Sequence, residues 1–108
     1  MAKAVIQTKN KNFDIIEPNV SFTDLSEDRF NSIVAACRDA YKMQHDGELK
    51  YFKDMAAYIK KRIEEEEKGT SGWHVIVGTN FGSFVTYEHK SIILFWLEHI
   101  GFLLFKHG

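Results

Sequence analysis

The chain of 108 residues is poor in cysteine, in proline and in long apolar runs. Its only cysteine, Cys37, cannot form an internal disulfide, which is typical of proteins in a reducing cytosol. No apolar stretch reaches the ~18 residues that a membrane-spanning helix needs, and the first residues lack the apolar core of a signal peptide. We therefore expect a cytosolic protein with one globular domain and no membrane partner.

The charge of the chain is nearly balanced, with a formal net charge of −1. Proteins that bind nucleic acid neutralise phosphates with a basic face, so this balance argues against a nucleic-acid partner. The five histidines lack the spacing of metal ligands, and Gly78 and Gly82 are not followed by the Lys-Ser/Thr of a phosphate-binding loop. We expect no catalytic constellation, no metal and no cofactor.

Two amphipathic helices are predicted from apolar residues that recur with helical spacing. Ser26 is a suitable N-cap for the first helix, which extends to about Met43. The second helix extends from about Phe52 to the acidic residues 64–67. The apolar stripes are formed by Phe30, Ile33, Val34, Cys37 and Tyr41 in the first helix, and by Phe52, Met55, Ala56, Ile59 and Ile63 in the second.

Four or five strands are predicted, at residues 19–23, 73–77, 83–87, 91–97 and 100–106. Strands 73–77 and 83–87 need not pair with each other, because Asn80-Phe81-Gly82 is not the Asn-Gly pair of a tight hairpin. The last two strands are apolar on both faces, which indicates cover on both sides. The two helices can cover one face only, so the simplest cover for the other is a second copy of the chain. The predicted fold class is α+β, with two helices packed on an antiparallel β-sheet.

Residues 73–86, WHVIVGTNFGSFVT, resemble the small hub-type dynein light chains, as do residues 54–61, DMAAYIKK, and the C-terminal LLFKHG. The resemblance is close over residues 53–108 and looser over residues 18–43. It divides the chain into a flexible extension, residues 1–16, and a light-chain domain, residues 17–108. It implies a strand-swapped homodimer in which strand 83–87 crosses to the partner subunit and the second sheet comes from the partner subunit.

The resemblance also implies a function. The chain would be a non-catalytic subunit of a dynein motor that binds extended segments of partner proteins, such as dynein intermediate chains, by β-strand addition in two symmetric grooves. Its place would be the cytoplasm and the cytoskeleton, and its divergence resembles that of ciliary and flagellar members. Carried over by position, the groove consists of Asp24, Lys53, Thr79, Asn80, Phe81, Gly82, Ser83, Phe84, Val85, Thr86, Tyr87, Ile92, Leu94, Trp96 and Gly101. The dimer interface consists of Tyr58, Lys61, His74, Ile76, Phe84 and Val85.

Several groove positions depart from the family pattern. Phe52 stands where the family usually has an acidic residue, and Ile92 and Leu94 replace aromatic residues. Lost polar contacts are worth about 0.5–1.5 kcal/mol each, so we expect an altered ligand preference.

The sequence is compatible with alternative interpretations of the partner, of His74 and of the N-terminal extension. The chain could be a dedicated structural subunit that forms a heterodimer with a related light chain. It could be a small enzyme that uses His74 for acid–base chemistry, although a histidine packed in a strand explains that residue more simply. In the extension, residues 5–8 (VIQT) resemble the peptides that bind this family, but residues 3–6 also resemble a first strand of the family, and termini are often disordered.

Overall fold

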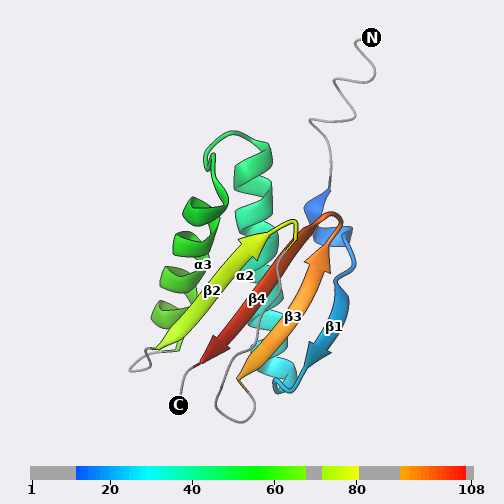
Figure 1. Cartoon of the computed structure of the whole chain (residues 1–108), viewed down its shortest axis with the longest axis vertical. Coiled ribbons are helices and arrows are strands. Elements are labelled where there is room, and N and C mark those ends of the chain that lie inside the picture. The colour runs from blue at the N-terminus through cyan, green and yellow to red at the C-terminus, as the bar shows by residue number, and fades with distance from the viewer. Residues whose placement is uncertain (1–11, 68–71, 81–90, 107–108) are drawn as a thin grey trace.

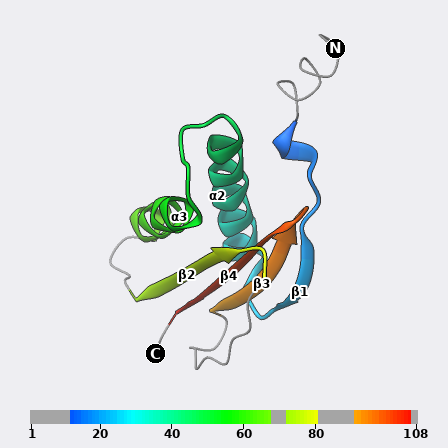
Figure 2. The ribbon, with the colours of Figure 1, turned by 45° about the horizontal axis from the view of Figure 1, so that its top comes forward.

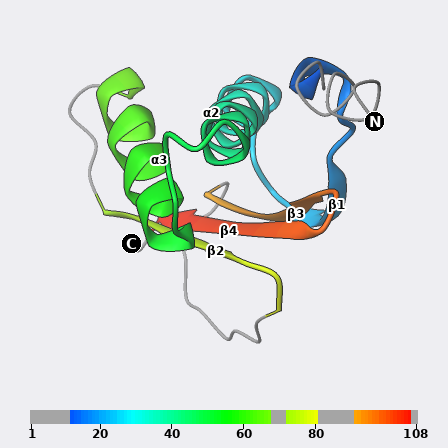
Figure 3. The ribbon, with the colours of Figure 1, turned by 90° about the horizontal axis from the view of Figure 1, so that it is seen from above.

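The computed structural model of the chain describes residues 12–67, 72–80 and 91–106. They form a 3-10 turn η1 (Phe13–Ile15), strand β1 (Asn19–Thr23), helices α2 (Glu27–His45) and α3 (Phe52–Glu66), and strands β2 (Trp73–Gly78), β3 (Ile92–Leu97) and β4 (Ile100–Lys106). The described strands make one antiparallel sheet in the order β1-β3-β4-β2 (Figure 1). Both helices lie on the same side of this sheet (Figure 3). The predicted α+β fold, two helices on an antiparallel sheet, is confirmed.

The helices begin and end where local signals direct them. Ser26 caps α2 by accepting a hydrogen bond from the backbone N–H of Arg29 at 3.4 Å, as the sequence predicted. The helix is followed by Gly47, whose φ of +86° is the left-handed conformation that glycine adopts without strain. At the start of α3, the Tyr51 N–H donates to Asp54 Oδ2 at 3.3 Å. Of the stripe predicted for α3, Met55, Ile59 and Ile63 are buried, whereas Phe52, in the first turn, is exposed.

The sheet has two different faces. The face toward the helices carries the main core, which includes Trp73 of β2, Phe95 of β3 and Phe102 of β4. The opposite face, called here the second face, carries a smaller cluster of Ile92, Leu103 and Phe105. These three side chains are buried within the single chain. Two large apolar residues remain exposed on this face, Phe22 of β1 at 46% and Ile76 of β2 at 39%.

The packed part of the chain begins before the family-like region. Phe13 of η1 is 5% exposed, and its ring lies edge-on to Tyr41 at 4.9 Å and to His45 at 5.3 Å. Both Nε and Nη2 of Arg38 donate to the carbonyl oxygen of Ile16, at 3.2 and 2.8 Å. Residues 13–16 were expected to belong to a flexible extension, but these contacts attach them to the end of α2 (Figure 2). Residues 1–11, including the peptide-like VIQT, lie outside the described part.

The turn between β3 and β4 is supported by Tyr41, the residue that also contacts Phe13. Glu98 has a φ of +57°, a conformation that residues with a Cβ rarely adopt. Its Oε1 accepts a hydrogen bond from the Tyr41 hydroxyl at 2.6 Å, and the His99 ring lies 6.3 Å from the Tyr41 ring. Tyr41 therefore joins η1, α2 and the β3–β4 turn.

Candidate functional site

One edge of the described sheet is β2, which pairs with β4 alone. Its alternation follows the sequence prediction, because Trp73, Val75 and Val77 face the helices. His74 and Ile76 lie on the second face, opposite Phe105 and Leu103. The His74 ring stacks on Phe105 with a centroid distance of 4.8 Å and an interplanar angle of 17°. The edge thus offers a strand backbone with an exposed isoleucine beside a stacked histidine.

Helix α3 lies along this edge, on the face of the sheet opposite to the second face (Figure 1). Lys60 connects the two elements, since its Nζ donates to the Trp73 carbonyl oxygen at 2.6 Å and to Glu64 Oε2 at 2.8 Å. The hydrogen bond from Lys60 lowers the pKa of the Glu64 carboxyl. The β2 edge is therefore held against a helix rather than suspended in solvent.

Two predicted interface residues, Tyr58 and Lys61, lie on a different side of α3 from Lys60. The Tyr58 hydroxyl accepts a hydrogen bond from Arg62 Nη1 at 3.3 Å, and the same guanidinium pairs with Asp39 of α2. Although partial burial opposes the charged form of Arg62, its hydrogen bonds to Asp39 and Tyr58 raise the pKa of the guanidinium. Lys61 is exposed and lies beside Tyr58 and Arg62. Within one chain, these residues and the pair His74 and Ile76 form two separate patches.

The predicted groove residues are only partly brought together. Lys53 is exposed in the first turn of α3, with its ammonium 5.8 Å from the Tyr51 ring, and Thr79 and Asn80 are exposed just after β2. Ile92, Leu94 and Trp96 share the second face of β3 by their register with β4. The other predicted residues, Phe81, Gly82, Ser83, Phe84, Val85, Thr86 and Tyr87, lie outside the described part of the chain.

Asp24 and Ile92 perform a structural task that the sequence did not reveal. Ile92 N–H donates to Asp24 Oδ1 at 3.1 Å, and its carbonyl oxygen accepts from the Asp24 N–H at 3.2 Å and from Thr23 Oγ1 at 3.0 Å. These bonds join the end of β1 to the start of β3. Ile92 is also buried, so its side chain offers little surface to a ligand of this single chain.

Trp96 and Gly101 form a cross-strand pair on the second face. A Cβ atom at position 101 would lie 2.7 Å from the Trp96 ring, closer than real side chains approach. The indole can lie flat over β4 only because Gly101 has no side chain. Both residues were predicted to lie in the groove, but only their pairing between β3 and β4 shows that the position of the Trp96 ring depends on Gly101.

We expect Gly101→Ala to lower the free energy of unfolding by about 1–3 kcal/mol, because overpacking forces the indole out of place. In a Trp96→Ala background the same substitution should cost less than about 0.5 kcal/mol, since the clashing ring is gone. Urea unfolding of the four proteins gives this coupling. An equal cost of Gly101→Ala in both backgrounds would show that the indole does not depend on the glycine.

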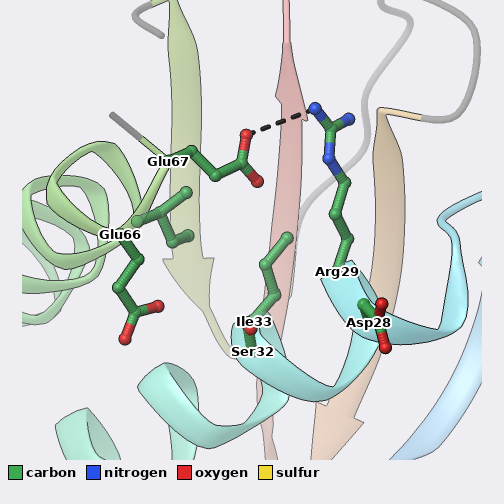
Figure 4. A pocket seen from close by; sticks show the side chains of 7 residues that line it. Asp28, Arg29, Ser32, Ile33, Glu66 and Glu67 are labelled. Atoms are coloured by element: carbon green, nitrogen blue, oxygen red, sulfur yellow. Dashed lines mark hydrogen bonds and ion pairs between the residues drawn. The ribbon is translucent and has the colours of Figure 1, made fainter. Parts of the chain in front are cut away.

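A cleft of about 360 Å³ lies between the start of α2 and the end of α3 (Figure 4). Its lining is formed by Asp28, Arg29, Ser32, Ile33, Ile63, Glu66 and Glu67. Arg29 donates to Glu67 Oε1 at 3.2 Å and to Ser91 Oγ at 3.1 Å, and its guanidinium lies 5.8 Å from the Trp73 ring. The arginine connects α2, the end of α3, β2 and the start of β3, so we interpret the cleft rim as structural.

The described residues contain no group of three or more side chains that could hold a metal ion, and no helix long and apolar enough to cross a membrane. Cys37 is buried, and desolvation raises the pKa of its thiol well above the usual value, although the charge of Arg62 acts in the opposite direction. A thiol in this state is a poor nucleophile. The described surface also presents β2, an outer strand of the described sheet, and the exposed side chain of Ile76.

Comparisons with known proteins identify the family of the chain. Residues 17–107 match the family model described as dynein light chain type 1. The cytoplasmic dynein light chain of Emericella nidulans is 41% identical over 93 residues, which cover 86% of this chain and 92% of that protein. The dynein light chain-like domain of a calcium-binding protein from Fasciola hepatica has the same fold, with a TM-score of 0.67, 18% identity, and coverage of 92% of this chain and 99% of that one. The family match and the 41% identity together establish that the chain belongs to the dynein light chain family.

Proposed function

We propose that this chain is a non-catalytic, homodimeric subunit of a dynein motor that binds extended segments of partner proteins by β-strand addition. Membership in the family supports the role of dynein light chain. The observation that carries the finer proposal is the β2 edge, which among the described strands pairs with β4 alone and lies along α3, with Ile76 39% exposed. Such an edge gives affinity through main-chain hydrogen bonds and specificity through flanking side chains.

The sheet order supports the exchange of a strand between subunits. β3 already has β1 on one side and β4 on the other, and β4 lies between β3 and β2. A strand at residues 83–87 therefore has no interior position in this sheet and must pair at an outer edge. We propose that it pairs with β2 of the partner subunit, which is a reciprocal contact with twofold symmetry. His74 and Ile76 would then be covered, and Phe84 and Val85 would lie in the interface.

In this dimer, the outer edge of each exchanged strand forms a groove with α3, and each groove holds one extended segment. Lys53 stands exposed at the start of α3, where it can contact the end of such a segment. Leu94 and Trp96 are partly exposed and remain candidates for the groove, whereas the burial of Ile92 argues for a lesser role. Two parallel grooves favour ligands that are themselves paired, such as dynein intermediate chains, because the second contact is intramolecular.

We extend the proposal to the enzymatic activity of the chain and to its location in the cell. The dynein light chain family consists of adaptors rather than enzymes, and we propose that this chain catalyses no reaction; His74, stacked on Phe105, then contributes packing. We propose the cytoplasm and cytoskeleton as its location, consistent with the cytoplasmic relative, and a cilium or flagellum as a further site of assembly.

An affinity pull-down with the tagged chain, followed by mass spectrometry, tests the proposed partners. Wild-type protein should recover dynein intermediate chains from cytosolic or ciliary extract. Ile76→Lys should lose them, because without a dimer there is no groove. Ile15→Lys is the matched control, since Ile15 is 72% exposed on η1. Recovery of a different light chain without intermediate chains would favour the heterodimeric structural subunit instead.

A further inference from the structure

The other edge of the sheet, β1, does not have the sequence of an edge strand. It pairs with β3 alone among the described strands, and all five of its residues are exposed. Val20 is 36% and Phe22 46% exposed. Edge strands that face solvent usually carry charged residues that prevent pairing, but Asn19–Thr23 contains none. Pro18, just before the strand, and a β-bulge between Val20 and Phe22 are typical of an edge.

A β-bulge gives β1 apolar residues on both faces. Val20 lies opposite Phe95 and Phe22 lies opposite Leu94, with the register shifted between them. Opposite residues in an antiparallel pair share a face. Val20 is therefore on the helix face with Phe95, and Phe22 is on the second face with Leu94, although residues two apart in a regular strand would share one face. Apolar residues on both faces are typical of strands whose two faces are both covered.

We propose that residues 4–8 of the same chain form a fifth strand, which adds antiparallel to the outer edge of β1. Their sequence, AVIQT, is rich in strand-forming residues. Val5 would cover one face of the added strand, while Ala4 and Ile6 would cover the other, which matches the two-sided apolar character of β1. Lys3 and Lys9, which flank this segment, would then give the new edge the charges that β1 lacks.

The course of the chain favours this occupant over a second copy of the protein. The described residues begin at Asn12, and η1 brings the chain to the end of the sheet where β1 starts (Figure 1). Phe13 and Ile16 are attached to α2 there. Residues 9–18 provide the connection, and neighbouring strands are only about 4.8 Å apart, so the chain can reverse direction easily. A tethered segment acts at an effective concentration of about millimolar, above that of any free partner.

Hydrogen exchange followed by mass spectrometry or NMR tests the fifth strand. In the full-length protein, the amides of residues 5–7 should exchange at least about tenfold more slowly than those of an unstructured peptide of the same sequence. The double variant Val5→Asp/Ile6→Asp should lose this protection and should accelerate exchange in β1 by a similar factor. The Asn12 Oδ1 accepts a hydrogen bond from the Asp14 N–H at 2.9 Å. Asn10→Asp/Asn12→Asp adds the same two charges outside the segment and keeps an oxygen acceptor at position 12, so it should behave like wild type.

Three results would overturn the proposal. The first is exchange of residues 5–7 at the unstructured rate. The second is protection of residues 5–7 that disappears when a dynein intermediate-chain peptide is added, with β1 unaffected, because the segment would then occupy the peptide groove. The third is protection of β1 that depends on protein concentration and is indifferent to Val5→Asp/Ile6→Asp, because a second copy would then cover the edge.

Discussion

Replacing Ile76 by lysine is expected to convert the proposed dimer into a folded monomer. In the single chain this side chain is partly exposed on the second face of β2, so a lysine there can remain in water when the chain is alone. In the dimer the ammonium would be buried without a partner, which costs about 3–5 kcal/mol. A loss of about 3 kcal/mol of binding free energy raises the dissociation constant of the dimer more than a hundredfold. The twofold symmetry also places the charge in the interface twice.

Sedimentation velocity at micromolar concentration measures this effect. Wild type should sediment with about twice the 12.5 kDa mass of one chain, and Ile76→Lys should sediment as a single chain with an unchanged circular dichroism spectrum. Ile15→Lys, an isoleucine-to-lysine change at a more exposed site, should remain dimeric. A dimer that is indifferent to Ile76→Lys would exclude β2 from the interface.

Replacing Phe13 by alanine is expected to reduce the free energy of unfolding by about 3 kcal/mol, the lower end of the range for core phenylalanines. The ring is buried against Tyr41 and His45, and its removal leaves a cavity at the end of α2. Because Tyr41 also supports Glu98, the loss should extend to the β3–β4 turn.

Urea unfolding provides the comparison with Ile15→Ala, two residues away and largely exposed, which should change stability by less than about 0.5 kcal/mol. If Phe13→Ala were as mild as Ile15→Ala, η1 would not belong to the cooperative unit. The domain would then begin at residue 17, where the family match begins.

Much of the fold could be predicted because its signals are local. Apolar spacing and the Ser26 cap predicted α2, and alternation predicted that Trp73 faces the helices while Ile76 does not. Strand β1 was predicted at the residues it occupies, directly after Pro18. In each case the decisive neighbours are a few residues apart in the sequence.

The features that could not be predicted depend on contacts between distant residues. Phe13 lies in a short apolar segment, residues 13–16, that was assigned to a flexible extension, and only its position against Tyr41 explains its burial. Arg29 meets Glu67 and Ser91 across 38 and 62 residues. The bulge in β1 follows from its pairing with β3, which no local pattern specifies.

The candidate site could be located only through the family resemblance. Composition and spacing predicted no catalytic constellation and gave no position for a groove. The structure then separated the carried-over residues by role, since Ile92 is buried and hydrogen-bonded to Asp24 while Lys53 and Asn80 are exposed. Residues 81–87, which the resemblance places at the centre of the groove, lie outside the described part.

Native mass spectrometry with an excess of a dynein intermediate-chain peptide tests the central claim most directly. A dimer that binds one extended segment in each groove predicts a complex of two chains and two peptides, with little of the singly occupied form at saturation. A single chain with one peptide, or a dimer that carries none, would contradict the account.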